Sequence, residues 1–78
     1  MSRYFFHVMD GKASIDTEGT ELPTLAAVRK EAVRTAGQIL TDQSQSWTGN
    51  KWQMTVVDAA GDAVFTLRFS ADTHGAIA

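Results

Sequence analysis

The sequence predicts an α+β fold of order ββαββ, a small, mostly antiparallel sheet with one helix packed on one face. Two observations predict it. Apolar and aromatic residues alternate near both ends of the chain, as they do in strands, whereas apolar residues in the middle recur at helical spacing. With 78 residues and no cysteine, the chain is expected to form a single domain over residues 1–70 without disulfides or thiolate zinc sites.

The first hairpin is predicted near the N-terminus. From Arg3 to Met9 the side chains alternate between two faces of a strand, with Tyr4, Phe6 and Val8 on one of them. Asp10 and Gly11 favour a type I′ turn, in which both central residues have positive φ. A second strand, roughly Lys12 to Asp16, is therefore expected to pair with the first.

A helix is predicted from Thr24 to about Thr41. Pro23 ends the extended segment before it, and the hydroxyl of Thr24 can cap the helix by accepting a hydrogen bond from an amide one turn further on. The apolar stripe expected to face the sheet consists of Leu25, Val28, Ala32, Ala36, Ile39 and Leu40. The polar, aperiodic segment 41–50 is expected to be a loop.

A second hairpin is predicted over about residues 51–69. Asp58 and Gly61 suit the first and fourth positions of a type I turn that closes with a left-handed glycine and a bulge. The residues expected to face the helix are Trp52, Met54, Val56, Phe65, Leu67 and Phe69. The small and polar residues 71–78 are expected to form a disordered C-terminal tail.

One helix covers only one face of a sheet, so the other face is expected to be open and to give Phe5, His7 and Met9 no cover from the same chain. Its further residues include Gln53 and Val64. Contiguous apolar surface on a small protein usually marks a contact site, whereas single exposed apolar residues need no explanation. Weighing these two interpretations, we favour a contact site, with an interface formed by Arg3, Phe5, His7, Met9, Thr55, Val57, Thr66 and Arg68.

His7 is the residue with the widest range of possible roles: a general base, a metal ligand, a pH-sensitive contact, or an interface side chain without chemistry. The other histidine, His74, lies in the predicted tail and offers no support for a metal site. No phosphate-binding glycine loop or nucleophile elbow occurs, and no base, nucleophile and orienting group can be named together. We therefore expect no enzyme activity, no catalytic residues, no metal and no cofactor.

Charge and hydropathy restrict the partners. The net charge of −2 disfavours nucleic acid, and no apolar run reaches the roughly 18 residues of a membrane span. The N-terminus also lacks the apolar region of a signal peptide. We expect a small soluble cytoplasmic interaction module, without a membrane, that forms a homodimer or binds a protein partner through the open face. The alternative is a nucleic-acid-binding regulator, with Phe5 stacking on bases and Arg3 and Arg68 on phosphates.

Three stretches resemble an uncharacterised family of short bacterial proteins, common in rhizobia and their relatives, which open with R-Y-F-F-H-V-x-D-G. They are RYFFHVMDG at 3–11, EGTELPTLAAVRKEA at 18–32 and VVDAAGDAVFTLRF at 56–69. The resemblance covers residues 3–69 and implies a domain of unknown function. Two positions depart from it, because the family often has aspartate where Thr24 stands and a charged residue where Met9 stands.

The segment DGKASIDTEGTELP at 10–23 is also similar to HicB-type antitoxins, whose fold runs strand, D-G turn, strand, L-P and helix. This chain lacks the antitoxins' proline-glycine-cysteine signature, and its last third forms a second hairpin in place of an appended DNA-binding helix pair. The similarity leaves an antitoxin-like regulator as an alternative function and is consistent with partner binding.

Overall fold

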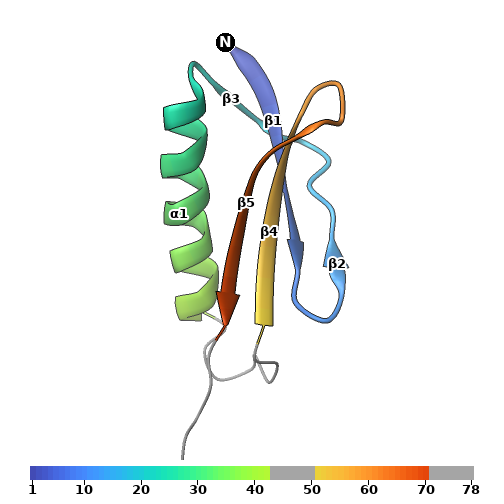
Figure 1. The fold of residues 1–78 in the computed structure, drawn as a ribbon, viewed down its shortest axis with the longest axis vertical. Coiled ribbons are helices and arrows are strands. Elements are labelled where there is room, and N and C mark those ends of the chain that lie inside the picture. The colour runs from blue at the N-terminus through green and yellow to red at the C-terminus, as the bar shows by residue number, and fades with distance from the viewer. Residues whose placement is uncertain (43–50, 71–78) are drawn as a thin grey trace, which may run out of the picture.

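One helix packs on one face of an antiparallel sheet in the computed structural model, which describes residues 1–42 and 51–70 (Figure 1). The elements are β1 (Ser2–Met9), β2 (Ala13–Ser14), β3 (Thr20–Leu22), α1 (Leu25–Asp42), β4 (Lys51–Asp58) and β5 (Ala63–Ser70). The predicted α+β fold is confirmed. The remainder of the predicted loop, at 43–50, and the predicted disordered tail, at 71–78, lie outside the described residues.

The sheet is built on two central strands, β1 and β4. They pair antiparallel, with Tyr4 opposite Asp58 and Met9 opposite Gln53. β5 pairs with the other side of β4. The other edge of β1 is shared by two short strands, β2 beside its C-terminal end and β3 beside its N-terminal end. The sequence did not predict β3.

The connection between β1 and β2 differs from the predicted type I′ turn. Met9 pairs with Ala13, so three residues form the connection, and among the described residues only glycines have positive φ. Gly11 has φ 104° and Asp10 does not adopt the conformation that a type I′ turn requires. The second strand is also shorter than predicted, because Asp16 bonds to β1 through side-chain atoms in place of a backbone ladder.

The turn between β4 and β5 confirms the prediction. The N–H of Gly61 donates to the carbonyl of Asp58 at 3.0 Å, and Gly61 has φ 88°. A bulge follows, because Val56 is opposite Phe65 whereas Val57 is opposite Ala63. This extra residue shifts the alternation, so Val64 packs against the core and not on the open face where it was predicted.

The core lies between α1 and the sheet. The N–H of Ala27 donates to the hydroxyl of Thr24 at 3.1 Å, which confirms the predicted cap. The fully covered residues are small on the helix and larger on the sheet, an arrangement that lets the helix approach closely: Val28, Ala32, Ala36, Trp52, Met54 and Val56. Leu25 and Phe69 were predicted to be inward, but they are 59% and 42% exposed.

Candidate functional site: the open face of the sheet

The face of the sheet opposite α1, hereafter the open face, is organised in three cross-strand rows. The upper row joins Phe5 to Val57 and Ala63, the central row joins His7 to Thr55 and Thr66, and the lower row joins Met9 to Gln53 and Arg68. Arg3 continues the alternation of β1 beyond the upper row. The pairing of the strands therefore brings all the residues of the predicted interface onto one face.

These residues differ in how far they are covered. Phe5, His7, Thr55, Val57 and Thr66 are half-buried, and the remaining three are exposed, with Met9 at 55%. The helix does not cover them, since it packs against the core side of the sheet (Figure 1). The middle of the open face is therefore partly apolar, and its arginines, Arg3 and Arg68, lie toward the two ends.

A segment of the same chain covers one part of this face. Gly19 has φ 74°, and a Cβ atom placed on it would lie 2.9 Å from Cε2 of Phe5 and 2.8 Å from Cγ of Arg3. The backbone of Gly19 therefore packs directly on the Phe5 ring. The expectation that Phe5 receives no cover from its own chain is wrong, because the segment between β2 and β3 folds back over the upper row.

Asp16 holds that segment in place. Its Oδ2 accepts the N–H of Phe6 at 3.1 Å, and its Oδ1 accepts the N–H groups of Glu18 at 3.1 Å and Gly19 at 3.0 Å. Asp16 thus fills the gap that β2 and β3 leave along the edge of β1. This role of Asp16 was not predicted from the sequence, although the Asp-x-x-Gly spacing, in which an aspartate commonly bonds to the following backbone, is a signal for it.

The pKa of Asp16 reflects these contacts. Partial burial raises the pKa of the carboxyl group, but the N–H groups of Gly19, Phe6 and Glu18 stabilise the carboxylate and lower the pKa by more, with a further contribution from His7. The net effect is a pKa below the ordinary value. Asp16 is therefore a charged structural group at neutral pH.

His7 is joined to the same segment through its ring. The N–H of Asp16 donates to Nδ1 of His7 at 3.1 Å. A nitrogen that accepts a hydrogen bond carries no proton, so the proton of the neutral ring is on Nε2. In this arrangement Nδ1 is already occupied, and the part of His7 left for other contacts is its Nε2 side. Within residues 1–42 and 51–70, no three His, Asp or Glu side chains form a group that could hold a metal ion.

The two arginines of the open face differ in their contacts within the chain. The guanidinium of Arg3 donates to the carbonyl of Glu18 at 2.7 Å and lies 3.6 Å from the carboxylate of Glu21. Arg68 has no ion pair or side-chain hydrogen bond among the described residues. Of the two cations considered for phosphate binding, Arg3 is therefore engaged within its own chain.

A pocket of about 560 Å³ lies at the lower end of the open face, where β4 begins and β5 ends. Its wall includes Met9, Lys51, Gln53, Arg68 and Phe69. Met9 and Arg68 were predicted as interface residues, but no pattern in the sequence grouped them with Lys51. In the part of the chain that the structure describes, no helix is long and apolar enough to cross a membrane.

The comparisons with known proteins give a single match. No curated protein and no solved structure matches the chain. The model of one family matches residues 3–70, from the start of the opening motif to the end of β5. The chain therefore belongs to the DUF6894 family, a domain of unknown function.

Proposed function

We propose that this protein is a non-catalytic interaction module that associates with a second copy of itself through the open face. One observation carries the proposal: α1 covers one face of the sheet, while the opposite face presents apolar side chains in adjacent positions on β1 and β4. Val57 lies beside Phe5 in the upper row, and Met9 extends the apolar surface toward the lower end.

The charge of the open face favours a second copy as the partner. The upper and central rows contain apolar residues, threonines and a histidine whose Nδ1 accepts a hydrogen bond. Two such surfaces can approach without burying an unpaired formal charge, a cost that commonly prevents association. The charged side chains Arg3 and Arg68 would lie toward the rim, where charged groups are usual in interfaces.

A two-fold arrangement would also limit the assembly to two copies. In such a contact each copy offers the same surface, so both faces are used and further growth stops. Complete burial of a valine or methionine side chain contributes about 1.5 to 3 kcal/mol. Phe5 would contribute less than a fully exposed ring because Gly19 already covers part of it.

Nucleic-acid binding has less support. Arg3 is engaged with Glu18 and Glu21, and the chain carries a net charge of −2. Phosphate binding depends on cations that are available to the nucleic acid. The open face offers Lys51 and Arg68 at its lower end, but its upper and central rows carry no arginine or lysine.

Light scattering coupled to size exclusion tests the proposal with a matched pair of variants. The wild-type protein is expected to be a dimer at tens of micromolar. Thr55→Lys places a cation in the central row, where two copies would have to bury two like charges, and is expected to give a folded monomer. Thr41→Lys makes the same substitution at an exposed position of α1 and is expected to remain a dimer.

Either of two results would contradict the proposal. One is a monomeric wild-type protein at tens of micromolar. The other is a Thr55→Lys variant that stays dimeric while its circular dichroism matches that of the wild type. If Thr55→Lys does not fold, Val57→Lys provides the same test from the upper row, since Val57 lies on the same face and outside the core.

A further inference from the structure

We propose that the pocket at the lower end of the open face binds a small organic anion, a phosphate monoester or a carboxylate attached to an apolar body. This inference does not depend on self-association, because the pocket is formed within one chain. It extends the function of the open face from a surface for a second copy to a site for a small molecule.

Two cations come together in this pocket. The sheet register places Lys51 opposite Ser70 and Gln53 opposite Arg68, so Lys51 and Arg68 are diagonal neighbours on adjacent strands. Diagonal neighbours lie about 7 to 8 Å apart, within reach of one another for long side chains. Two like charges at this spacing repel each other unless an anion lies between them. An anion bound between the two cations would attract both of them and offset their mutual repulsion.

The two cations in the pocket wall have no acceptors among the described residues. Neither Lys51 nor Arg68 has an ion pair or side-chain hydrogen bond among the described residues. Among the described residues, no Asp or Glu contributes to the wall. A wall whose described part holds two cations and no carboxylate fits a ligand that supplies acceptor oxygens.

The remaining wall accounts for the apolar part of the ligand. Met9 and Phe69 both border the pocket and are 55% and 42% exposed. The volume of about 560 Å³ is within the range of roughly 300 to 1,000 Å³ typical of small-molecule sites. The pocket can therefore hold more than a single inorganic ion, and the exposed thioether of Met9 favours an apolar body.

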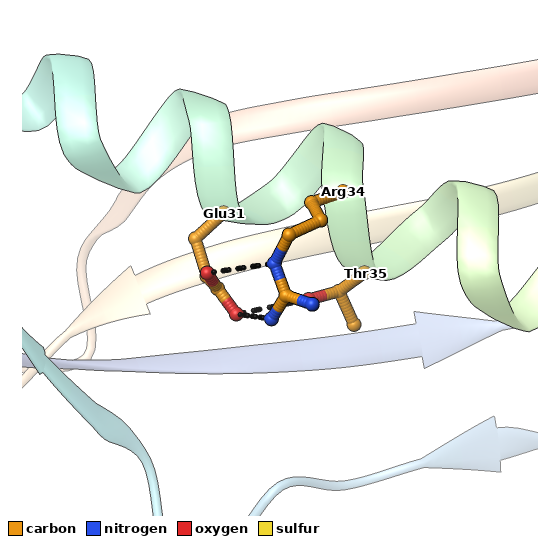
Figure 2. A network of polar contacts seen from close by, with 3 residues as sticks. All are labelled: Glu31, Arg34 and Thr35. Atoms are coloured by element: carbon orange, nitrogen blue, oxygen red, sulfur yellow. Dashed lines mark hydrogen bonds and ion pairs between the residues drawn. The ribbon is translucent and has the colours of Figure 1, made fainter.

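A second basic pocket, on the outer side of α1, is a weaker candidate. It has about 530 Å³ and includes Arg29, Lys30 and Arg34 in its wall. Figure 2 shows that Glu31 binds the guanidinium of Arg34 and also accepts the hydroxyl of Thr35. This carboxylate already neutralises one of the cations. The helix pocket therefore serves as the internal comparison for the test.

The test is a titration followed by two-dimensional ¹H–¹⁵N NMR on the full chain. The probes are phenyl phosphate, benzoate, inorganic phosphate and the neutral benzyl alcohol, at constant ionic strength. We expect at least one of the two aromatic anions to shift the amide signals of Met9, Gln53 and Arg68 with saturation. Comparison of phenyl phosphate with benzoate distinguishes a phosphate site from a carboxylate site, and inorganic phosphate shows how much the apolar body contributes.

Two variants locate the site. Arg68→Gln is expected to weaken binding of the preferred anion about tenfold, the size expected for the loss of a charge-assisted contact. Arg29→Gln removes a cation from the helix pocket and is expected to leave the affinity within about twofold. Lys51→Gln gives a second test if Arg68→Gln alters the fold. Light scattering on each sample reports the oligomeric state separately.

Several results would overturn the proposal. They are the absence of saturable shifts with both aromatic anions, shifts confined to the helix pocket, equal binding of benzyl alcohol, and unchanged affinity in folded Arg68→Gln. A monomeric wild-type protein that binds an aromatic anion at the pocket would contradict self-association and support this inference, so the two proposals fail separately.

Discussion

The backbone N–H of Asp16 donates to Nδ1 of His7, and the carboxylate of Asp16 accepts the N–H of Phe6, the residue before His7, at 3.1 Å in each case. The two residues are thus joined in both directions across the edge of β1. This link fixes the His7 ring on the open face and anchors the segment that covers Phe5. The shape of the upper half of the face therefore depends on Asp16.

Removing the Asp16 carboxylate is expected to destabilise the fold. Asp16→Ala leaves the N–H groups of Phe6, Glu18 and Gly19 without their acceptor, and the loss of hydrogen bonds to a charged group costs about 1 to 3 kcal/mol. Urea unfolding followed by circular dichroism measures the difference. Asp62→Ala is the control, because that exposed side chain makes no hydrogen bond among the described residues, and it should stay within about 0.5 kcal/mol. Equal effects of the two substitutions would contradict this role.

Stability is expected to fall in acid because of Asp16 and Glu31. The hydrogen bond from Arg34 lowers the pKa of Glu31, and backbone N–H groups lower the pKa of Asp16 despite the opposing effect of burial. A group whose pKa is lower in the folded state stabilises the protein above its ordinary pKa, and this contribution is lost as the pH falls through the folded-state pKa. The free energy of unfolding should therefore decrease below about pH 4.

The contribution of Asp16 to this pH dependence can be isolated with Asp16→Asn. This variant keeps an acceptor oxygen but cannot titrate, so its unfolding free energy should change less with pH than that of the wild type. Chemical denaturation at several pH values from neutral to acidic measures both slopes. If both proteins lose stability equally on acidification, the lowered pKa of Asp16 is not what links stability to pH.

Gly19 is expected to tolerate a side chain less well than Gly61. Both glycines have positive φ, so alanine at either position costs about 1 to 2 kcal/mol. A Cβ at Gly61 would meet no atom within 4 Å, whereas one at Gly19 would lie 2.9 Å from the carbonyl oxygen of Tyr4 and close to the Phe5 ring. Gly19→Ala should therefore cost a further 1 to 3 kcal/mol or so. Thermal and urea unfolding of both variants test this, and equal losses would show that Gly19 does not pack on β1.

The two methionines on the strands provide a matched test of which face is the core. Met54 on β4 is fully buried against α1, and Met9 on β1 is 55% exposed on the open face. Met54→Ala should cost about 2 to 5 kcal/mol. Met9→Ala should stay within about 0.5 kcal/mol when unfolding is measured at high dilution. A larger loss for Met9→Ala would mean that the inward and outward faces are reversed.

The alternation of β1 and β4 was enough to predict the open face from the sequence, since side chains on a strand change face at every residue. The same rule failed at Val64, because the bulge after Gly61 inserts one residue and reverses the alternation. The helix cap at Thr24 was also predictable from the sequence, because a cap is a local interaction. The prediction of a type I′ turn at Asp10 was wrong, because the connection contains three residues and not two.

Features that depend on distant segments were not predictable. β3 contains three residues without an alternating pattern, and it exists because they pair with Ser2, Arg3 and Tyr4. The position of Gly19 on Phe5 follows from that pairing. The lower pocket joins Met9, Lys51 and Arg68, which are far apart in the sequence and meet only when β1, β4 and β5 align.

The central claim is that the open face contacts a second copy, and an isotope-filtered NOE experiment on a mixture of ¹³C-labelled and unlabelled protein tests it most directly. Only protons of different copies give signals in this experiment. We predict intermolecular NOEs that join the methyl groups of Val57 and Thr55 to the Phe5 ring or to the other residues of the central row. The absence of intermolecular NOEs at millimolar concentration, or NOEs that arise only from the exposed helix residues Leu25 and Val33, would contradict the claim.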